Sequence, residues 1–153
     1  TGFSATYLNG EKVEREIRDR EVSDNVSPVS TIAGVRARLV ELQRSLGAGG
    51  GVVMDGRDIG TVVFPAARLK IFMTARPEVR AQRRYLELVS KGLPADFDAV
   101  MKNISERDRI DSSREVSPLR QADDAVVLDN SDMTPEEQMV WFRELYKKRI
   151  NES

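Results

Sequence analysis

Three short, almost uninterrupted apolar runs constrain the fold of this 153-residue chain more than any other feature. They cover residues 51–54, 69–73 and 125–128, and each is bounded by residues that break regular structure. A strand with one face in water alternates apolar and polar residues, whereas a strand covered on both faces is apolar throughout. The runs therefore predict doubly buried strands, as in a parallel sheet.

Amphipathic helical patterns separate and follow these runs. Their apolar residues recur at steps of three and four. The predicted helices cover residues 27–46, 77–90, 96–113 and 134–150. Ser27 is the expected N-cap of the first helix, with Pro28 in its first turn. This order of strands and helices predicts an α/β fold with a mostly parallel sheet flanked by helices.

A small β element is expected ahead of the first helix. Asn9-Gly10 stands between two short β-prone stretches and is a strong signal for a two-residue hairpin turn. The highly charged residues 14–21 follow, and we expect them to be solvated.

Composition excludes several kinds of catalyst and partner. Neither Cys nor His occurs, which removes a Cys nucleophile, a Ser-His-Asp triad and nearly every zinc site. The 24 basic and 25 acidic residues nearly cancel, so we expect no nucleic-acid or membrane partner. No apolar run approaches the roughly 20 residues of a membrane span. These features favour a soluble cytoplasmic protein, and we expect a monomer.

Charged residues follow directly after the first predicted strand. Arg57 and Asp58 lie between Gly56 and Gly60. Glycine lets the backbone approach a ligand closely, and ligands of open α/β sheets bind beyond the carboxyl ends of the strands. The pair is a candidate binding site, with a salt-bridged turn as the open alternative.

A second constellation is predicted on the helix 96–113 and its end. Arg107, Asp111 and Arg114 follow at steps of four and three, so they share a helical face. That face continues the apolar stripe that begins at Phe97. Two guanidinium groups beside a carboxylate suit a phosphate and a sugar hydroxyl. An exposed ion pair is the open alternative.

Arg36 is a third candidate. It lies four residues after Ile32 and three before Leu39, on the apolar side of its predicted helix. A buried guanidinium needs an anionic or polar partner. Ser27 would bring a hydroxyl to the start of that helix, although plain N-capping explains it equally well.

A further group consists of the arginines around the helix predicted for residues 77–90, namely Arg76, Arg80, Arg83 and Arg84. Arg83 lies at the edge of its apolar face, whereas Arg80 and Arg84 are expected to point outward. A solvated helix face is the open alternative for this group.

Together these segments resemble bacterial cytidylate kinase, in order and over nearly the whole chain. The matching motifs are Ile17-Arg18 leading into Val22, Ser27 and Arg36; Asp55 to Pro65; Lys70-Ile71-Phe72 with Arg83-Arg84; Glu106-Arg107-Asp108 with Asp111 and Arg114; and Ser117-Pro118-Leu119. The resemblance implies a P-loop kinase-type parallel sheet with a small β-containing insertion that binds the nucleoside monophosphate.

The resemblance implies transfer of the γ-phosphoryl group of ATP, with Mg²⁺, to CMP or dCMP. It implies that Ser27, Arg36 and Asp58 meet the cytosine. Cytosine offers an amino donor and ring acceptors, so a hydroxyl, a guanidinium and a carboxylate can form hydrogen bonds that recognise it.

The resemblance also implies roles around the phosphates. Arg57, Arg107 and Arg114 would be the catalytic arginines, and they would bind CMP together with Asp111. Arg83 would face the donor nucleotide. Phosphoryl transfer depends mainly on positioning and positive charge, so an arginine-rich chain without His or Cys is suited to it.

Domain boundaries follow from the same resemblance. Residues 1–46 would form part of the monophosphate-binding domain, and residues 47–153 the α/β core, with a lid at about 91–117.

The P-loop signature, Gly-x-x-x-x-Gly-Lys followed by Ser or Thr, does not occur in residues 1–153. We therefore expect the P-loop strand to lie outside them and this chain alone to lack turnover.

Three alternatives remain open at this point. The first is a non-catalytic domain that binds a pyrimidine nucleotide. The second is an arginine-rich RNA-binding domain, which the net charge of −1 disfavours. The third is a kinase specific for uridylate or adenylate.

Overall fold

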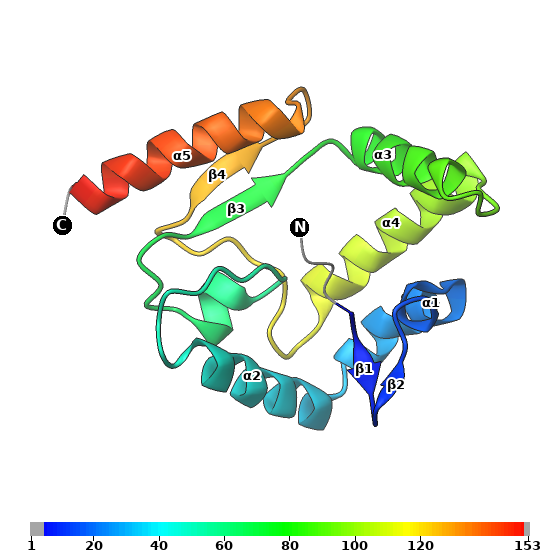
Figure 1. Ribbon diagram of the computed structural model, residues 1–153, viewed down its shortest axis with the longest axis horizontal. Coiled ribbons are helices and arrows are strands. Elements are labelled where there is room, and N and C mark those ends of the chain that lie inside the picture. Colours follow the sequence, from blue (N-terminus) through cyan, green and yellow to red (C-terminus); the bar gives the residue numbers. More distant parts are fainter. Residues whose placement is uncertain (1–4, 152–153) are drawn as a thin grey trace.

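The computed structural model describes residues 5–151, which form helices, helical turns and short strands (Figure 1). In chain order they are β1 (Tyr7–Leu8), β2 (Glu11–Lys12), a 3₁₀ turn η1 (Glu16–Arg18), α1 (Arg20–Ser30), α2 (Ala33–Gly47), a π-helical turn η2 (Ile59–Val63), β3 (Ile71–Thr74), α3 (Pro77–Ser90), α4 (Phe97–Ser113), β4 (Val126–Asp129) and α5 (Pro135–Asn151).

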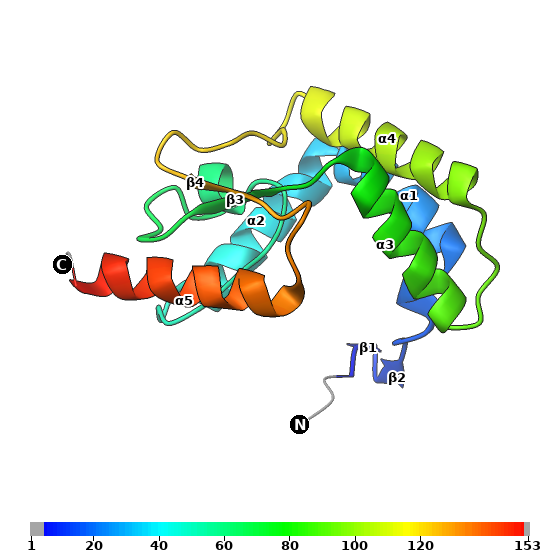
Figure 2. The ribbon, with the colours of Figure 1, turned by 90° about the horizontal axis from the view of Figure 1, so that it is seen from above.

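The central sheet pairs β3 with β4 in parallel. Ile71 is opposite Val126, and Thr74 is opposite Asp129. Helix α5 runs alongside this pair, while α3 and α4 fold back on each other with α1 next to α4 (Figures 1 and 2). The parallel pair flanked by helices confirms the predicted fold class. No helix within residues 5–151 combines the length and apolar character needed to cross a membrane.

The first predicted strand is wrong. Residues 51–54 form no strand, and Val53 is 93% exposed. A strand exists only where a neighbour accepts and donates its backbone hydrogen bonds, and none of the described residues pairs with this run. Apolar content alone indicates a preference for burial, which a chain segment cannot satisfy without that neighbour.

The first predicted helix is also wrong in its start. Ser27 and Pro28 lie inside α1, so Ser27 is not an N-cap, and α2 begins only at Ala33. Proline removes a backbone donor from a helix interior. Helix α1 ends two residues after it, in a tight turn where the amides of Thr31 and Ile32 donate to the carbonyls three residues back, both at 3.1 Å.

Local signals elsewhere are confirmed. Asn9 and Gly10 form the hairpin turn with φ of 52° and 87°, the left-handed pair that such a turn requires. Thr134 and Glu137 form a reciprocal capping box, with amide-to-side-chain distances of 2.7 and 3.2 Å. Helix α3 has the predicted bounds, and α4 and α5 each begin one residue later.

Polar side chains make up much of what this chain buries. Val40, Val63, Ala81 and Leu128 are the buried apolar residues among those described. The buried polar or charged residues are Ser27, Arg36, Asp58, Asp111, Arg114 and Ser131. Because burying a charge without a partner is costly, the surroundings of these groups define where a ligand would bind.

Candidate functional site

Five charged residues form what we call the charged cluster, and they come from three separate segments. They are Arg36 of α2, Arg57 and Asp58 ahead of η2, and Asp111 and Arg114 at the end of α4. Ser27 and Ser30 of α1 lie at the border of this cluster, since Arg114 reaches Ser30.

Arg36 forms a buried ion pair with Asp58. Its Nη2 donates to Asp58 Oδ2, and the two side chains are 10% and 4% exposed. Arg44, eight residues further along α2, donates to the carbonyls of Val62 and Val63 at 2.7 and 3.1 Å. Helix α2 therefore contacts η2 at both ends: Arg44 binds the end of η2, and Arg36 binds Asp58 just ahead of its start. The anionic partner that Arg36 was expected to need is Asp58.

Asp111 forms ion pairs with two arginines of the cluster. Arg57 Nε donates to Asp111 Oδ2 at 3.0 Å, and Arg114 Nη1 lies 3.5 Å from Asp111 Oδ1. The Asp111 and Arg114 side chains are 5% and 3% exposed, whereas that of Arg57 is 45% exposed. The apolar side of α4 therefore continues into a buried polar end, as the helical spacing predicts.

Electrostatic coupling joins both pairs into one site. Burial lowers the pKa of the Arg114 guanidinium most, and the nearby Arg36 lowers it further. Asp111 and Asp58 act in the opposite direction and raise that pKa. Three guanidinium groups against two carboxylates leave one positive charge in a largely buried place. An anionic ligand would balance it.

Apart from Arg80 Nε at the cavity beside α3, three guanidinium nitrogens of the described residues are buried without a hydrogen-bond partner. They are Arg36 Nε, Arg107 Nε and Arg114 Nη2. Buried donors in folded proteins are almost always paired. These three unpaired donors therefore point to an acceptor that the chain itself does not provide, and a phosphate or a base edge has the required lone pairs.

Ser27 and Arg107 lie together between α1 and α4. They line a small cavity of about 40 Å³ that also includes Asp24 and Ile110. Ser27 is 5% exposed, and its carbonyl accepts from Ser30 Oγ at 2.7 Å. The structure thus brings these two predicted residues to the border of the charged cluster.

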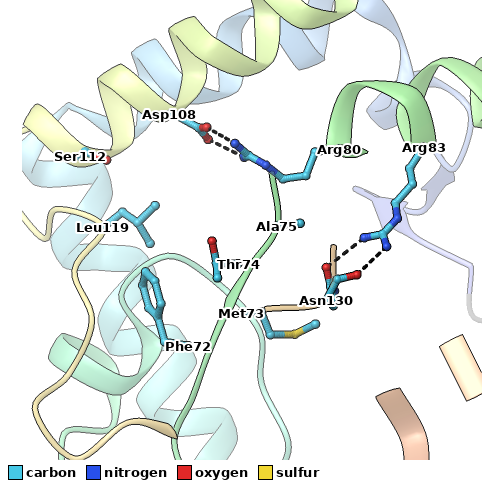
Figure 3. Close-up of a pocket in the computed structure, with 10 residues that line it drawn as sticks. All are labelled: Phe72, Met73, Thr74, Ala75, Arg80, Arg83, Asp108, Ser112, Leu119 and Asn130. Carbon is cyan, nitrogen blue, oxygen red and sulfur yellow. Dashed lines mark hydrogen bonds and ion pairs between the residues drawn. The ribbon is translucent and has the colours of Figure 1, made fainter. Parts of the chain in front are cut away.

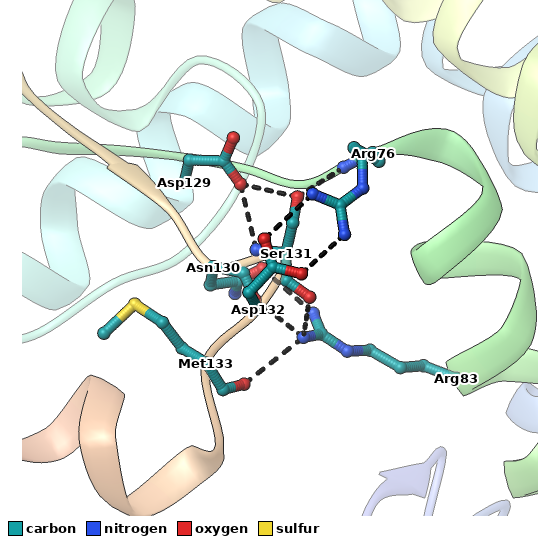
Figure 4. A network of polar contacts seen from close by, with 7 residues as sticks. All are labelled: Arg76, Arg83, Asp129, Asn130, Ser131, Asp132 and Met133. Carbon is teal, nitrogen blue, oxygen red and sulfur yellow. Dashed lines mark hydrogen bonds and ion pairs between the residues drawn. The ribbon is translucent and has the colours of Figure 1, made fainter.

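Arg83 lies elsewhere, at the carboxyl ends of the two parallel strands. Its guanidinium donates to the side-chain and backbone oxygens of Asn130 at 2.9 and 2.7 Å (Figures 3 and 4). It lines a cavity of about 330 Å³ between the sheet edge, α3 and α4 (Figure 3). The structure separates Arg83 from the other seven predicted residues.

Arg80 lines the same cavity, although its spacing predicted an outward orientation. Its guanidinium donates to both oxygens of Asp108 at 3.0 and 2.6 Å (Figure 3). Asp108 belongs to another helix, so no spacing within α3 could reveal this partner. The only signal available was the count of four arginines around one helix.

The parallel strands, the arginine-lined cavity at their carboxyl ends and the charged cluster define an α/β protein with two arginine-rich candidate sites for anionic ligands. The chain belongs to the cytidylate kinase family: the sequence profile of that family, "Cytidylate kinase", matches residues 1–146. This membership confirms the resemblance drawn from the motifs.

Individual relatives agree with the family match. The chain is 61% identical over 150 residues to the cytidylate kinase of Parabacteroides distasonis, which covers 98% of this chain and 66% of the relative. It is 58% identical over 149 residues to that of Porphyromonas gingivalis, covering 97% and 64%. For Flavobacterium johnsoniae the identity is 56% over 144 residues, covering 94% and 63%. The chain therefore spans about two thirds of the length of these relatives.

Proposed function

We propose that this chain carries the CMP or dCMP site of an enzyme that transfers the γ-phosphoryl group of ATP to that nucleotide. The observation that carries the proposal is the charged cluster, with its unbalanced positive charge and the unpaired donors of Arg36 and Arg114. Membership in the cytidylate kinase family and the names of the relatives support the choice of substrate.

The cytosine would bind beside the Arg36–Asp58 pair. Asp58 offers carboxylate lone pairs to the exocyclic amino group, and Arg36 offers its unpaired Nε–H to a ring acceptor. Ser27 would supply a hydroxyl from α1. The ion pair orients both groups before the base arrives, so little side-chain freedom remains to be lost on binding.

The phosphate of CMP would bind among Arg57, Arg107 and Arg114. Arg57 is half exposed and paired with Asp111, so it can turn from that carboxylate to a phosphate. Asp111 would then be available to a sugar hydroxyl. Guanidinium groups around the transferred phosphoryl stabilise its equatorial oxygens, which is the main contribution that a protein makes to such a transfer.

ATP would bind on the other side, at the carboxyl ends of β3 and β4. The cavity there is lined by Arg80 and Arg83, which suits a polyphosphate. Among the described residues, no group of three or more Asp, Glu, His or Cys side chains could hold a metal ion. These residues do not form a protein site for Mg²⁺, so within this proposal the ion would arrive with the ATP phosphates.

The domain assignment remains part of the proposal. Residues 1–46 would belong to the monophosphate-binding domain and residues 47–153 to the core. A lid at about 91–117 would include α4, which carries Arg107 and Asp111. We further propose a cytoplasmic monomer whose partners are nucleotides rather than nucleic acid or membrane.

Calorimetric titration of the chain with CMP, dCMP, UMP, AMP and ATP tests this proposal. We expect CMP or dCMP to bind about tenfold more tightly than UMP or AMP, because an unpaired polar group penalises the wrong base. Binding of ATP as well separates a kinase from a non-catalytic pyrimidine-nucleotide domain. Equal affinity for all monophosphates, or no CMP binding, would contradict the proposal.

A matched pair of variants locates the site. Arg57→Ala removes a half-exposed guanidinium from the charged cluster and should weaken CMP binding about tenfold or more. Arg38→Ala removes an exposed arginine from the outer side of α2, where it pairs with Glu41, and should leave CMP binding unchanged. A similar loss in both variants would indicate only general attraction between charges.

A further inference from the structure

The break between α1 and α2 places a serine hydroxyl against the charged cluster. Helix α1 ends at Ser30, and there Ser30 Oγ donates to the carbonyl of Ser27 at 2.7 Å. The same oxygen accepts from Arg114 Nη1 at 3.2 Å. A hydroxyl has one proton and two lone pairs, so it can serve both groups at once.

Arg114 is held by the chain at two of its three nitrogens. Besides the contact to Ser30, its Nε donates to the carbonyl of Ser117 at 2.7 Å. Ser117 is a residue with positive φ, 52°, which turns that carbonyl back toward the helix end. A guanidinium is planar, so fixing Nε and Nη1 also fixes the direction of Nη2. Nη2 is the nitrogen that is buried without a partner.

We propose that Ser30 is a positioning residue: its hydroxyl sets the plane of the Arg114 guanidinium and so aims the unpaired Nη2 at the phosphate of the bound nucleotide. This inference rests on the proposed function. The third contact of Arg114, to Asp111, is longer at 3.5 Å and involves the same Nη1, so it does not define the plane by itself.

Comparable serines show that the local bond alone does not explain Ser30. Ser45 Oγ donates to the carbonyl of Leu42 at 2.7 Å, and Ser90 Oγ donates to that of Glu87 at 2.8 Å. These are the same bonds to the residue three positions earlier. Within the described part of the chain, no guanidinium donates to either hydroxyl. Ser45 is therefore a matched control that has the helical bond but lacks the arginine.

Calorimetric titration with CMP, accompanied by thermal unfolding, tests the role of Ser30. Ser30→Ala should weaken CMP binding about tenfold or more, the effect of one hydrogen bond to a charged group, while Ser45→Ala leaves it unchanged. Ser30→Thr and Ser30→Val form a second pair of nearly equal shape. Thr retains the hydroxyl and should retain affinity, whereas Val should lose it, even if Ser30→Ala fails to fold.

A double-mutant cycle distinguishes positioning from a merely structural role. In an Arg114→Gln background, Ser30→Ala should cause no further loss of CMP affinity, since its effect passes through Arg114. Additive losses would overturn the inference, as would unchanged CMP binding by both Ser30→Ala and Ser30→Val. Absence of CMP binding by the parent chain would overturn the proposed function, and this inference with it.

Discussion

In the charged cluster ionised side chains are buried, whereas across the two-stranded sheet large apolar side chains are exposed. Asp58 and Asp111 are each 3% exposed, while Met73 of β3 and Val127 of β4 are 58% and 48% exposed. The difference shows that charged and apolar side chains become buried under different conditions. Opposite charges can satisfy one another within a few side chains, but apolar burial needs a covering surface of comparable area.

Loss of the buried Arg36–Asp58 ion pair should destabilise the protein most. Arg36→Ala leaves the Asp58 carboxylate buried without its partner, and should lower the free energy of unfolding by about 3–5 kcal/mol. Urea unfolding measures this. The double variant Arg36→Met with Asp58→Leu should regain most of the loss, because an apolar pair needs no counter-charge. A loss as large in that double variant would show that packing, not charge, dominates there.

Two neighbouring residues of β4 should contribute unequally to stability. Leu128 is 6% exposed, so Leu128→Ala should cost about 2–5 kcal/mol in urea unfolding. Val127 is the next residue along and faces the other way, so Val127→Ala should cost only about 0.5 kcal/mol. Equal costs for the two variants would mean that the Val127 face is covered in solution.

Exposed carboxylates should give a smaller, acid-dependent effect. The side-chain hydrogen bonds from Arg76 lower the pKa of Asp132 below its ordinary value of 3.8, and this network lies at the end of β4 (Figure 4). Stability from such a group is present above its ordinary pKa and is lost as the pH falls through the lowered value. Asp132→Asn should therefore make the loss of stability below about pH 4 slightly less steep.

The control for that measurement is Asp123→Asn, at another exposed aspartate near the same strand. Denaturant unfolding at a series of pH values should show the change only for Asp132. Because both Arg76 and Asp132 are largely exposed, solvent screens their pair and the change should be modest. An identical change for both aspartates would assign it to net charge.

Val53 should give the smallest effect of all. Its side chain is 93% exposed in a segment without regular structure, so Val53→Thr should change the free energy of unfolding by less than about 0.5 kcal/mol. The same urea experiment measures it. A clear loss of stability would show that the Val53 side chain is buried in solution.

The site residues could be predicted from the sequence only within each separate segment. Periodicity predicted that Arg36 lies on the buried side of its helix and that Asp111 and Arg114 share a face, and both predictions are confirmed by burial. The partners could not be predicted in this way. The start of the first helix was misjudged because Ser-Pro marks a helix beginning only on average, whereas here the preceding residues already form α1.

The hairpin at Asn9-Gly10, the helices α3 to α5 and the family could be predicted from the order of the residues, because they depend on local conformational preferences and on ordered motifs. The ion-pair partners could not be predicted without the three-dimensional arrangement. Arg36 meets Asp58 across 22 positions, and Arg57 meets Asp111 across 54. Contacts between such distant positions depend on how helices and loops pack, and the strand predicted at residues 51–54 failed for the same physical reason: a strand is defined by its neighbour.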